Sequence, residues 1–127
     1  MITNEQVMAL IVSLAEALSA GDAPAAAMNW EVPALVLYDE GNAQIGQIEQ
    51  ATEFYAQAIP WYNQRGDITL KGELENLKPL TQKLAAVTVR WLGFDSAGRE
   101  SSVERSYYIV RLGDDGRVRV RVALGLL

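Results

Sequence analysis

The clearest pattern in the sequence is the strict alternation of apolar and polar residues in its last third. The alternating runs are residues 84–94, 100–112 and 118–122, with turn-forming residues at 95–98 and 113–116 between them. In the first run every second position from Ala85 to Trp91 is apolar, and alternate side chains of a strand point to the same face. The pattern predicts consecutive antiparallel strands joined by hairpins.

The second of these strands has two different faces. One face carries, in order, Glu104, Ser106, Tyr108, Val110 and Leu112. Arg105 and Arg111 mark the opposite face as the one turned to solvent. We therefore expect Tyr108 to point inward beside Trp91, where the two line a pocket, and Tyr107 to point outward.

Helical spacing begins at the N-terminus. Residues 3–6 have the spacing of a capping box, and an apolar stripe at steps of three and four follows through residues 7–18. Gly21 is expected to end this helix. Asp22 then caps a second, short helix that should reach about Trp30.

The middle of the chain predicts one more helix between two strands. The strands are expected at residues 34–38 and 67–78, with a turn at residues 39–42. Helical spacing extends from residue 46 to residue 66. Pro60 lies inside this stretch, and its ring clashes with the preceding turn, so we expect a kink or an early end near Ile59.

Composition narrows the chemistry. The 127 residues are 50% hydrophobic, which fits one domain over residues 1–127 with one core. The formal net charge of −5 disfavours nucleic acid as a partner. The chain has no Cys and no His, which removes disulfides, thiolate nucleophiles, imidazole bases and the common zinc ligands. We expect neither a metal nor another cofactor.

The apolar stretch near the N-terminus is interpreted as an amphipathic helix of a cytoplasmic protein. Glu5 and Glu16 bracket it, and no basic residues precede it as they do in a signal peptide. No run in the sequence reaches the roughly 20 apolar residues that a membrane span requires. We therefore expect no membrane partner.

Helices followed by long antiparallel strands form an α+β layout, in which a curved sheet wraps around the helices. The order of several short motifs resembles the nuclear transport factor 2-like superfamily, the cone-shaped α+β barrel of steroid Δ-isomerases, scytalone dehydratase and polyketide cyclases. The motifs are Gly21-Asp22, residues 33–39, Phe54-Tyr55, and residues 87–91, 95–98, 107–111 and 115–116. The resemblance implies N-terminal helices packed in a curved antiparallel sheet.

The same resemblance implies that isomerase chemistry is lost. The general base of the steroid isomerases falls at Tyr38, their oxyanion-hole tyrosine at Leu14, and the aspartate that assists it at Tyr108. That chemistry needs a carboxylate to take the proton and two donors to hold the enolate oxygen. The histidines of the cyclases and the dehydratase have no counterpart, because the chain has no His.

The resemblance also implies a ligand site inside the cone. Its expected members are Leu14, Trp30, Tyr38, Tyr55, Trp91, Ser106 and Tyr108. Such an aromatic cluster suits a small apolar or aromatic molecule, with hydroxyl groups to orient it. The alternative is that these aromatic side chains fill the cone as an ordinary core.

Two carboxylates are candidates for catalysis. Glu104 lies on the inward face of its strand and would be a general base near the mouth of the cone. The alternative is a rim carboxylate paired with an arginine such as Arg90. Asp39 follows the isomerase base position by one residue, so a bulge would bring it into the cone, although turn chemistry also explains it.

Two functions remain open. The first is a pocket protein for a small molecule, either a cofactor-free lyase or isomerase or a binder without chemistry. The second is a non-catalytic module for dimerisation or protein interaction. We expect a homodimer in either case, because the outer face of the sheet mixes arginines with apolar residues such as Leu92, Val103 and Ile109.

Overall fold

The computed structural model describes residues 1–124, and residues 125–127 of the expected domain lie outside the described part. The elements are α1 (Asn4–Ser19), α2 (Ala23–Ala27), β1 (Trp30–Tyr38), β2 (Gly41–Ile45), α3 (Ile48–Gln64), β3 (Thr69–Pro79), β4 (Leu84–Phe94), β5 (Glu100–Leu112) and β6 (Val118–Leu124). The predicted alternating strands are all present, and the capping box at Thr3 begins α1 as expected.

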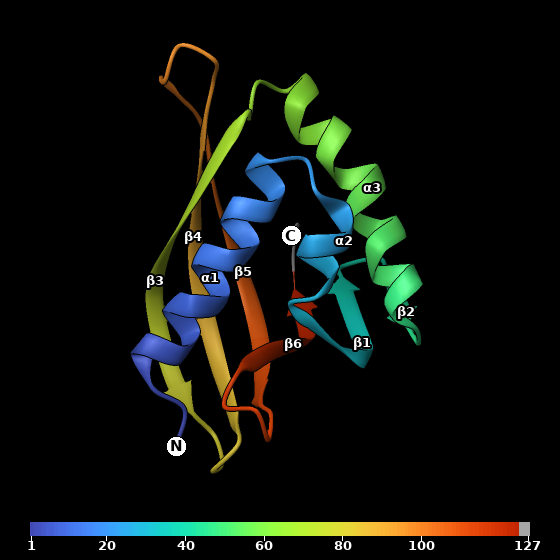
Figure 1. Ribbon diagram of the computed structural model, residues 1–127, viewed down its shortest axis with the longest axis vertical. Coiled ribbons are helices and arrows are strands. Elements are labelled where there is room, and N and C mark those ends of the chain that lie inside the picture. Colours follow the sequence, from blue (N-terminus) through green and yellow to red (C-terminus); the bar gives the residue numbers. More distant parts are fainter. Residues whose placement is uncertain (125–127) are drawn as a thin grey trace.

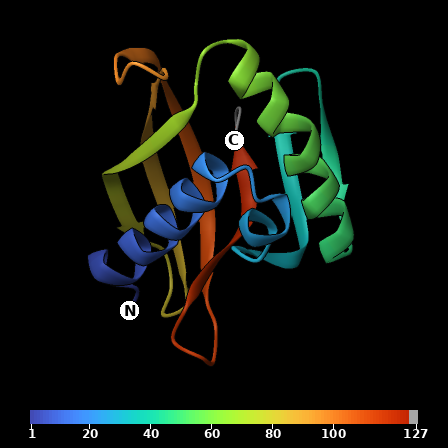
Figure 2. The same ribbon diagram turned by 45° about the horizontal axis from the view of Figure 1, so that its top comes forward.

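The strands form one curved sheet in the order β2-β1-β6-β5-β4-β3. Figures 1 and 2 show α1 across the β3–β5 side of the sheet and α3 along the β1–β2 side, so both helices cover the same face. The two end strands, β2 and β3, do not pair with each other, and the cone stays open. The predicted α+β cone is confirmed.

One pairing differs from the expected antiparallel sheet. β1 pairs with β6 in parallel, with Leu35 opposite Val122 and Leu37 opposite Leu124. The other pairings, including β1 with β2, are antiparallel. The alternation of apolar and polar residues in a strand indicates which face is buried but not which strand it pairs with. The sequence pattern therefore could not predict the parallel pairing.

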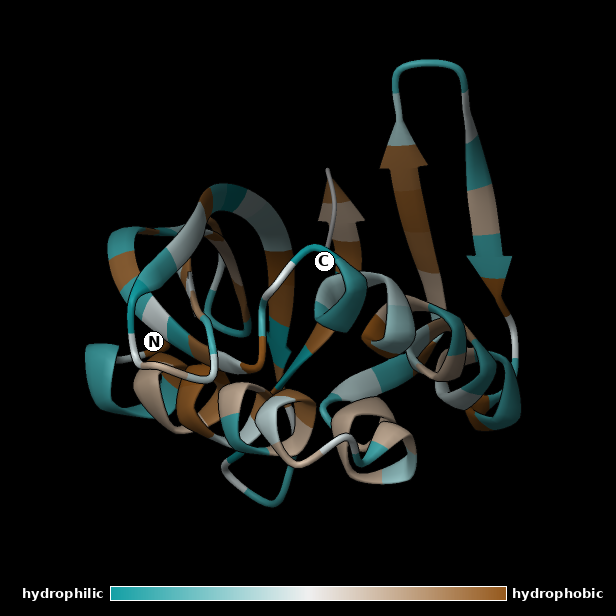
Figure 3. Ribbon diagram, turned by 90° about the horizontal axis from the view of Figure 1, so that it is seen from above, coloured by the Kyte–Doolittle hydropathy of each residue, from teal (hydrophilic) through white to brown (hydrophobic). Residues whose placement is uncertain are grey.

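The first hairpin also differs from the prediction. α2 ends at Ala27, and Trp30 begins β1 instead of ending the helix. The predicted turn at residues 39–42 is shorter, because residues 41–45 form β2. Figure 3 shows why β2 was missed: β1 is largely hydrophobic, whereas β2 is largely hydrophilic, and Gly and Asn have low strand propensity.

The helix α3 continues through Pro60 to Gln64, so the expected early end near Ile59 is wrong. Proline cannot donate to the carbonyl of Ala56, four residues earlier. Both Ala56 and Pro60 are exposed, so water can bond the carbonyl that loses its partner. Apolar residues on the other side of the helix, including Tyr55 and Ile59, hold it against the sheet.

One hydrophobic core fills the space between the sheet and the helices. The inward residues of β4 are all buried, and on β5 Tyr108 is 3% exposed while Tyr107 is 48% exposed. The predicted register of these two strands is confirmed. Within residues 1–124, no helix is both long and apolar enough to cross a membrane.

Candidate functional site

Four of the aromatic residues predicted to form the site lie together in the core, and we call Trp30, Tyr55, Trp91 and Tyr108 the aromatic cluster. Each is at most 3% exposed. The Trp30 indole N–H donates to the Tyr55 hydroxyl at 2.7 Å, and the Trp91 indole N–H donates to the Tyr108 hydroxyl at 3.2 Å. The cluster therefore consists of two Trp–Tyr pairs whose polar atoms bond each other.

Leu14 and Ser106 accompany the cluster, and Tyr38 does not. Leu14 is 1% exposed and Ser106 is fully buried. Tyr38 is 51% exposed and is the last residue of β1, whereas Trp30 is the first. It lines an outer groove of about 500 Å³ together with Tyr107.

The tyrosines of the core keep their protons. Burial raises the pKa of Tyr108 to about 12, although hydrogen bonds with Ser106 and Trp91 act in the opposite direction. Burial and the nearby Tyr108 raise the pKa of Tyr55 well above its ordinary value. All these hydroxyls are therefore neutral donors and acceptors at physiological pH.

Two sizeable grooves are lined by described residues outside the aromatic cluster, although Gly72, in the groove between α1 and β3, lies against the Trp91 ring. The largest described, of about 630 Å³, runs between α1 and β3, where Ile11, Ala15 and Leu70 line it. Neither this groove nor the one beside Tyr38 is lined by Trp91 or Tyr108. The burial of the cluster fits the alternative that these aromatic side chains act as core.

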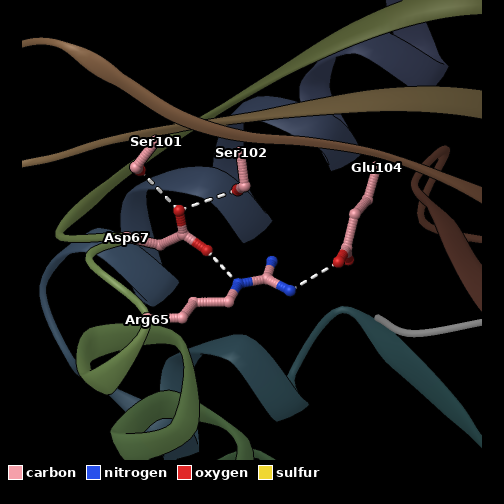
Figure 4. Close-up of polar contacts among 5 residues, drawn as sticks. All are labelled: Arg65, Asp67, Ser101, Ser102 and Glu104. Atoms are coloured by element: carbon pink, nitrogen blue, oxygen red, sulfur yellow. Dashed lines mark hydrogen bonds and ion pairs between the residues drawn. The ribbon is translucent and has the colours of Figure 1, made fainter.

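Charged side chains gather instead at the mouth of the cone, where α3 ends. Gly66 has a φ of +96°, the left-handed conformation that ends a helix, and the Asp67 amide donates to the Tyr62 carbonyl at 2.9 Å. This turn directs Asp67 toward the sheet and leaves Arg65 beside it. We call Arg65, Asp67 and Glu104 the mouth network (Figure 4).

Asp67 is the buried anchor of the mouth network. Its side chain has no exposed surface, and its Oδ1 accepts from the hydroxyls of Ser101 at 2.6 Å and Ser102 at 2.7 Å. Its Oδ2 accepts from Arg65 Nε. Burial acts to raise the pKa of Asp67, but these three donors outweigh it and hold the pKa below its usual range.

A glycine makes room for this anchor. A Cβ at Gly93 of β4 would lie 2.1 Å from Asp67 Oδ1 and 2.6 Å from Ser102 Oγ. No side chain fits there without moving the carboxylate. The sequence therefore holds Asp67 against the sheet through Gly93 on one strand and two serines on the next.

Glu104 completes the mouth network from β5. Its Oε1 accepts from Arg65 Nη1, whereas Arg90, the partner suggested from the sequence, bonds Glu73 at 2.7 Å. The other oxygen, Oε2, is buried, and no described residue donates to it. Glu104 is thus an inward carboxylate with one oxygen fixed by Arg65 and one oxygen to which no residue of the described part donates.

Sequence reasoning missed Arg65 and Asp67. Asp67 was assigned to a strand, and Arg65 was not considered. The available signal was the Arg-Gly-Asp order at the end of a helix, since a glycine there turns the chain and places both charges at one edge of the core. The other carboxylate candidate, Asp39, is exposed in the turn between β1 and β2 and lines the outer groove beside Tyr38.

The site offers acid–base and hydrogen-bonding chemistry. Within residues 1–124 no three acidic side chains converge on a point that could hold a metal ion. The chemical groups present are a carboxylate, a guanidinium and several neutral phenols. These groups suit binding of an organic molecule or transfer of a proton.

The fold and this inward-facing site define an α+β cone of the nuclear transport factor 2 type. The family described as "NTF2-like protein (DUF6841)" matches residues 4–125, and the chain belongs to it. No protein with a curated description matches the chain.

Solved structures agree on the fold. An NTF2-like protein of unknown function from Shewanella oneidensis superposes with a TM-score of 0.73 at 18% identity, over 97% of this chain and 98% of that one. A cystatin-like domain of unknown function from Nostoc punctiforme gives 0.72 at 19%, over 99% and 81%. A ketosteroid isomerase-like protein from Erwinia carotovora atroseptica gives 0.66 at 13%, over 97% and 95%.

Proposed function

We propose that the protein binds a small organic molecule at the mouth of its cone, with Glu104 as the principal acceptor. The observation that carries this proposal is Glu104 Oε2, a buried oxygen to which no described residue donates. A buried polar atom without a partner costs about 1–3 kcal/mol, and more when it is charged. A ligand with a donor at this position would recover that cost.

The rest of the mouth network supports this assignment. Arg65 holds Glu104 Oε1, and Asp67 holds Arg65, so the carboxylate has a fixed orientation before any ligand arrives. A pre-organised acceptor loses little entropy on binding. The Arg65 guanidinium also lies 4.5 Å from the centre of the Trp61 ring, which restrains it further.

The same proposal has a second part, in which Glu104 acts on the bound molecule as a catalyst. A carboxylate held beside a bound molecule is a general base when that molecule carries an acidic proton. We do not expect steroid isomerisation to be that reaction, because the resemblance aligns Leu14, Tyr38 and Tyr108 with its base and oxyanion positions, and no carboxylate stands at any of the three. We expect no measurable conversion of a Δ5-ketosteroid, and conversion that one substitution in the cone abolishes would contradict this.

Native mass spectrometry of the purified protein tests the binding proposal. We expect a small molecule to remain bound to the wild type and to the Glu73→Ala variant, whose exposed carboxylate pairs with Arg90 on the sheet. The Glu104→Ala variant should lose it. Equal retention by both variants would overturn the role of Glu104, and a protein that carries no ligand and binds none from a fragment library would overturn the proposal.

The second candidate function is dimerisation through the outer face of the sheet, the face turned away from the helices. Two rows of apolar side chains cross this face from strand to strand: Leu37, Leu124 and Tyr107 in one, and Leu35, Val122, Ile109 and Ala86 in the other. Tyr107 is 48% exposed and Leu124 is 38% exposed. Large apolar patches of this kind are typical of interfaces.

The arginines on this face have carboxylate partners within the chain. Arg105 pairs with Glu75 at 2.7 Å, whereas Arg111 and Arg121 share Glu31, at 3.6 and 3.1 Å. A second copy of the chain would therefore meet apolar rows bordered by charges that are largely compensated, which limits repulsion between identical surfaces. These features support a homodimer.

Sedimentation velocity tests the dimer. We expect a dimer at micromolar concentration, a monomer for Tyr107→Glu, and a dimer for the control Val12→Glu, a residue of α1 that is similarly exposed at 46%. A monomeric wild type would contradict the proposal. So would a Tyr107→Glu variant that remains a dimer.

A further inference from the structure

The charges around Glu104 carry an inference about the class of ligand, which rests on the proposed function. We propose that the mouth network accepts a protonated amine on an apolar or aromatic framework and that the ammonium group donates to Glu104 Oε2. The alternatives that the same site must discriminate against are neutral alcohols and carboxylates.

The first step concerns Arg65, whose charge is already shared between two carboxylates. Its Nε donates to Asp67 and its Nη1 donates to Glu104, so its fork is directed at two carboxylates. Its guanidinium also lies over the rings of Trp61 and Tyr62, at 4.5 and 5.6 Å from their centres. A ligand carboxylate on the remaining N–H groups of Arg65 would bring a third negative charge beside Asp67 and Glu104, and repulsion between like charges disfavours it.

The second step is the balance of charge. One guanidinium faces two carboxylates, so the mouth network of Arg65, Asp67 and Glu104 carries a net negative charge. Asp67 is already satisfied by two serine hydroxyls and Arg65, which leaves the unmatched charge at Glu104. A cation restores neutrality there, whereas a neutral alcohol satisfies the hydrogen bond only.

The third step is the surroundings of Glu104. Tyr62 is 3% exposed, and its pKa is raised by burial, by Tyr108 and by Glu104, which shows that this phenol lies within the electrostatic field of the carboxylate. Within residues 1–124, Arg65 is the one Lys or Arg that forms an ion pair with Glu104. Aromatic faces attract cations and give an apolar framework a surface to pack on.

The fourth step is access. Oε2 itself is buried, but the side chain of Glu104 is 26% exposed and that of Arg65 is 24% exposed. The carboxylate therefore lies just below the surface, at the open end of the cone. Binding of an ammonium group there requires the side chains that cover Oε2 to move.

The test compares three probes of one shape: benzylamine, benzyl alcohol and benzoate. Each is titrated into the wild type, Glu104→Gln and the control Glu73→Gln at neutral pH, and the tryptophan indole N–H signals are followed by NMR. We expect benzylamine to bind tightest, and Glu104→Gln to weaken it by about 10-fold or more, as for a hydrogen bond between charged groups. Glu73→Gln should bind like the wild type.

The outcomes separate the ligand class from the site. Tighter binding of benzoate or benzyl alcohol that still depends on Glu104 overturns the amine and leaves the proposed function standing. Benzylamine binding that Glu104→Gln does not change overturns the assignment to Oε2. If none of the probes causes a response, both the ligand class and the proposed function are overturned. If the Glu104→Gln variant does not fold, the order of affinity of the three probes for the wild type still decides the ligand class.

Discussion

The aromatic cluster and the mouth network face the same interior and differ in how their polar atoms are satisfied. In the cluster each indole N–H has a tyrosine hydroxyl as its partner, and the rings are almost completely buried. In the mouth network Asp67 accepts from three donors, but one buried oxygen of Glu104 has no donor among residues 1–124.

This difference separates stability from function. A core whose polar groups are paired gains from packing and has no need of a ligand. A buried charge with an open position costs free energy unless something else supplies the bond. We therefore expect the aromatic residues that attract attention in the sequence to support the cone, and the charges at its mouth to carry the proposed binding.

The largest expected effect is that of Leu14→Ala. Leu14 is 1% exposed and belongs to the hydrophobic core, so its truncation should leave a cavity and lower the free energy of unfolding by about 3–5 kcal/mol. Denaturant unfolding measures this, with exposed Val12→Ala of the same helix as the control. A loss below about 1 kcal/mol would show that Leu14 borders empty space instead.

Asp67→Asn is expected to cost about 2–3 kcal/mol at neutral pH, because it removes a buried charge that Arg65 and two serines stabilise. The pKa of Asp67 is lowered in the folded state, so its contribution is present above its unfolded pKa of about 3.9 and is lost as pH falls through the folded value. We would measure the free energy of unfolding of the wild type and of Asp67→Asn from pH 7 to pH 3. The gap between the two values should narrow below about pH 4. A gap that is constant over this range would contradict the ionised anchor.

The smallest expected effect on stability is that of Tyr108→Phe. The ring stays and only the hydroxyl bonded by Trp91 is lost, which costs about 0.5–1.5 kcal/mol. Because Tyr108 lies near Tyr62 and the mouth network, the same variant should change ligand binding. If Tyr108→Phe changes the stability but leaves the ligand affinity unchanged, Tyr108 belongs wholly to the core.

The alternation of residues was sufficient to predict the face of each long strand. Trp91 and Tyr108 were placed inward from their neighbours in the sequence, and the structure confirms both. The capping box at Thr3 likewise predicted the start of α1. These signals are local, and one buried face against one solvated face determines the register.

The features that the sequence did not reveal depend on contacts between distant segments. β2 is short and polar and is ordered by its pairing with β1, and the parallel neighbour of β1 is supplied by the last strand of the chain. The mouth network joins Arg65 to Glu104, 39 positions further along. No periodicity in either segment predicts that they meet.

The most direct test of the central claim is a crystal structure of the protein soaked with benzylamine, with the environment of Glu104 Oε2 as the measurement. The account predicts an amine nitrogen about 2.7–3.0 Å from Oε2, with Arg65 still bonded to Oε1. The contradicting result is Oε2 bonded to a protein group such as the Tyr62 hydroxyl, with the amine absent from the mouth of the cone.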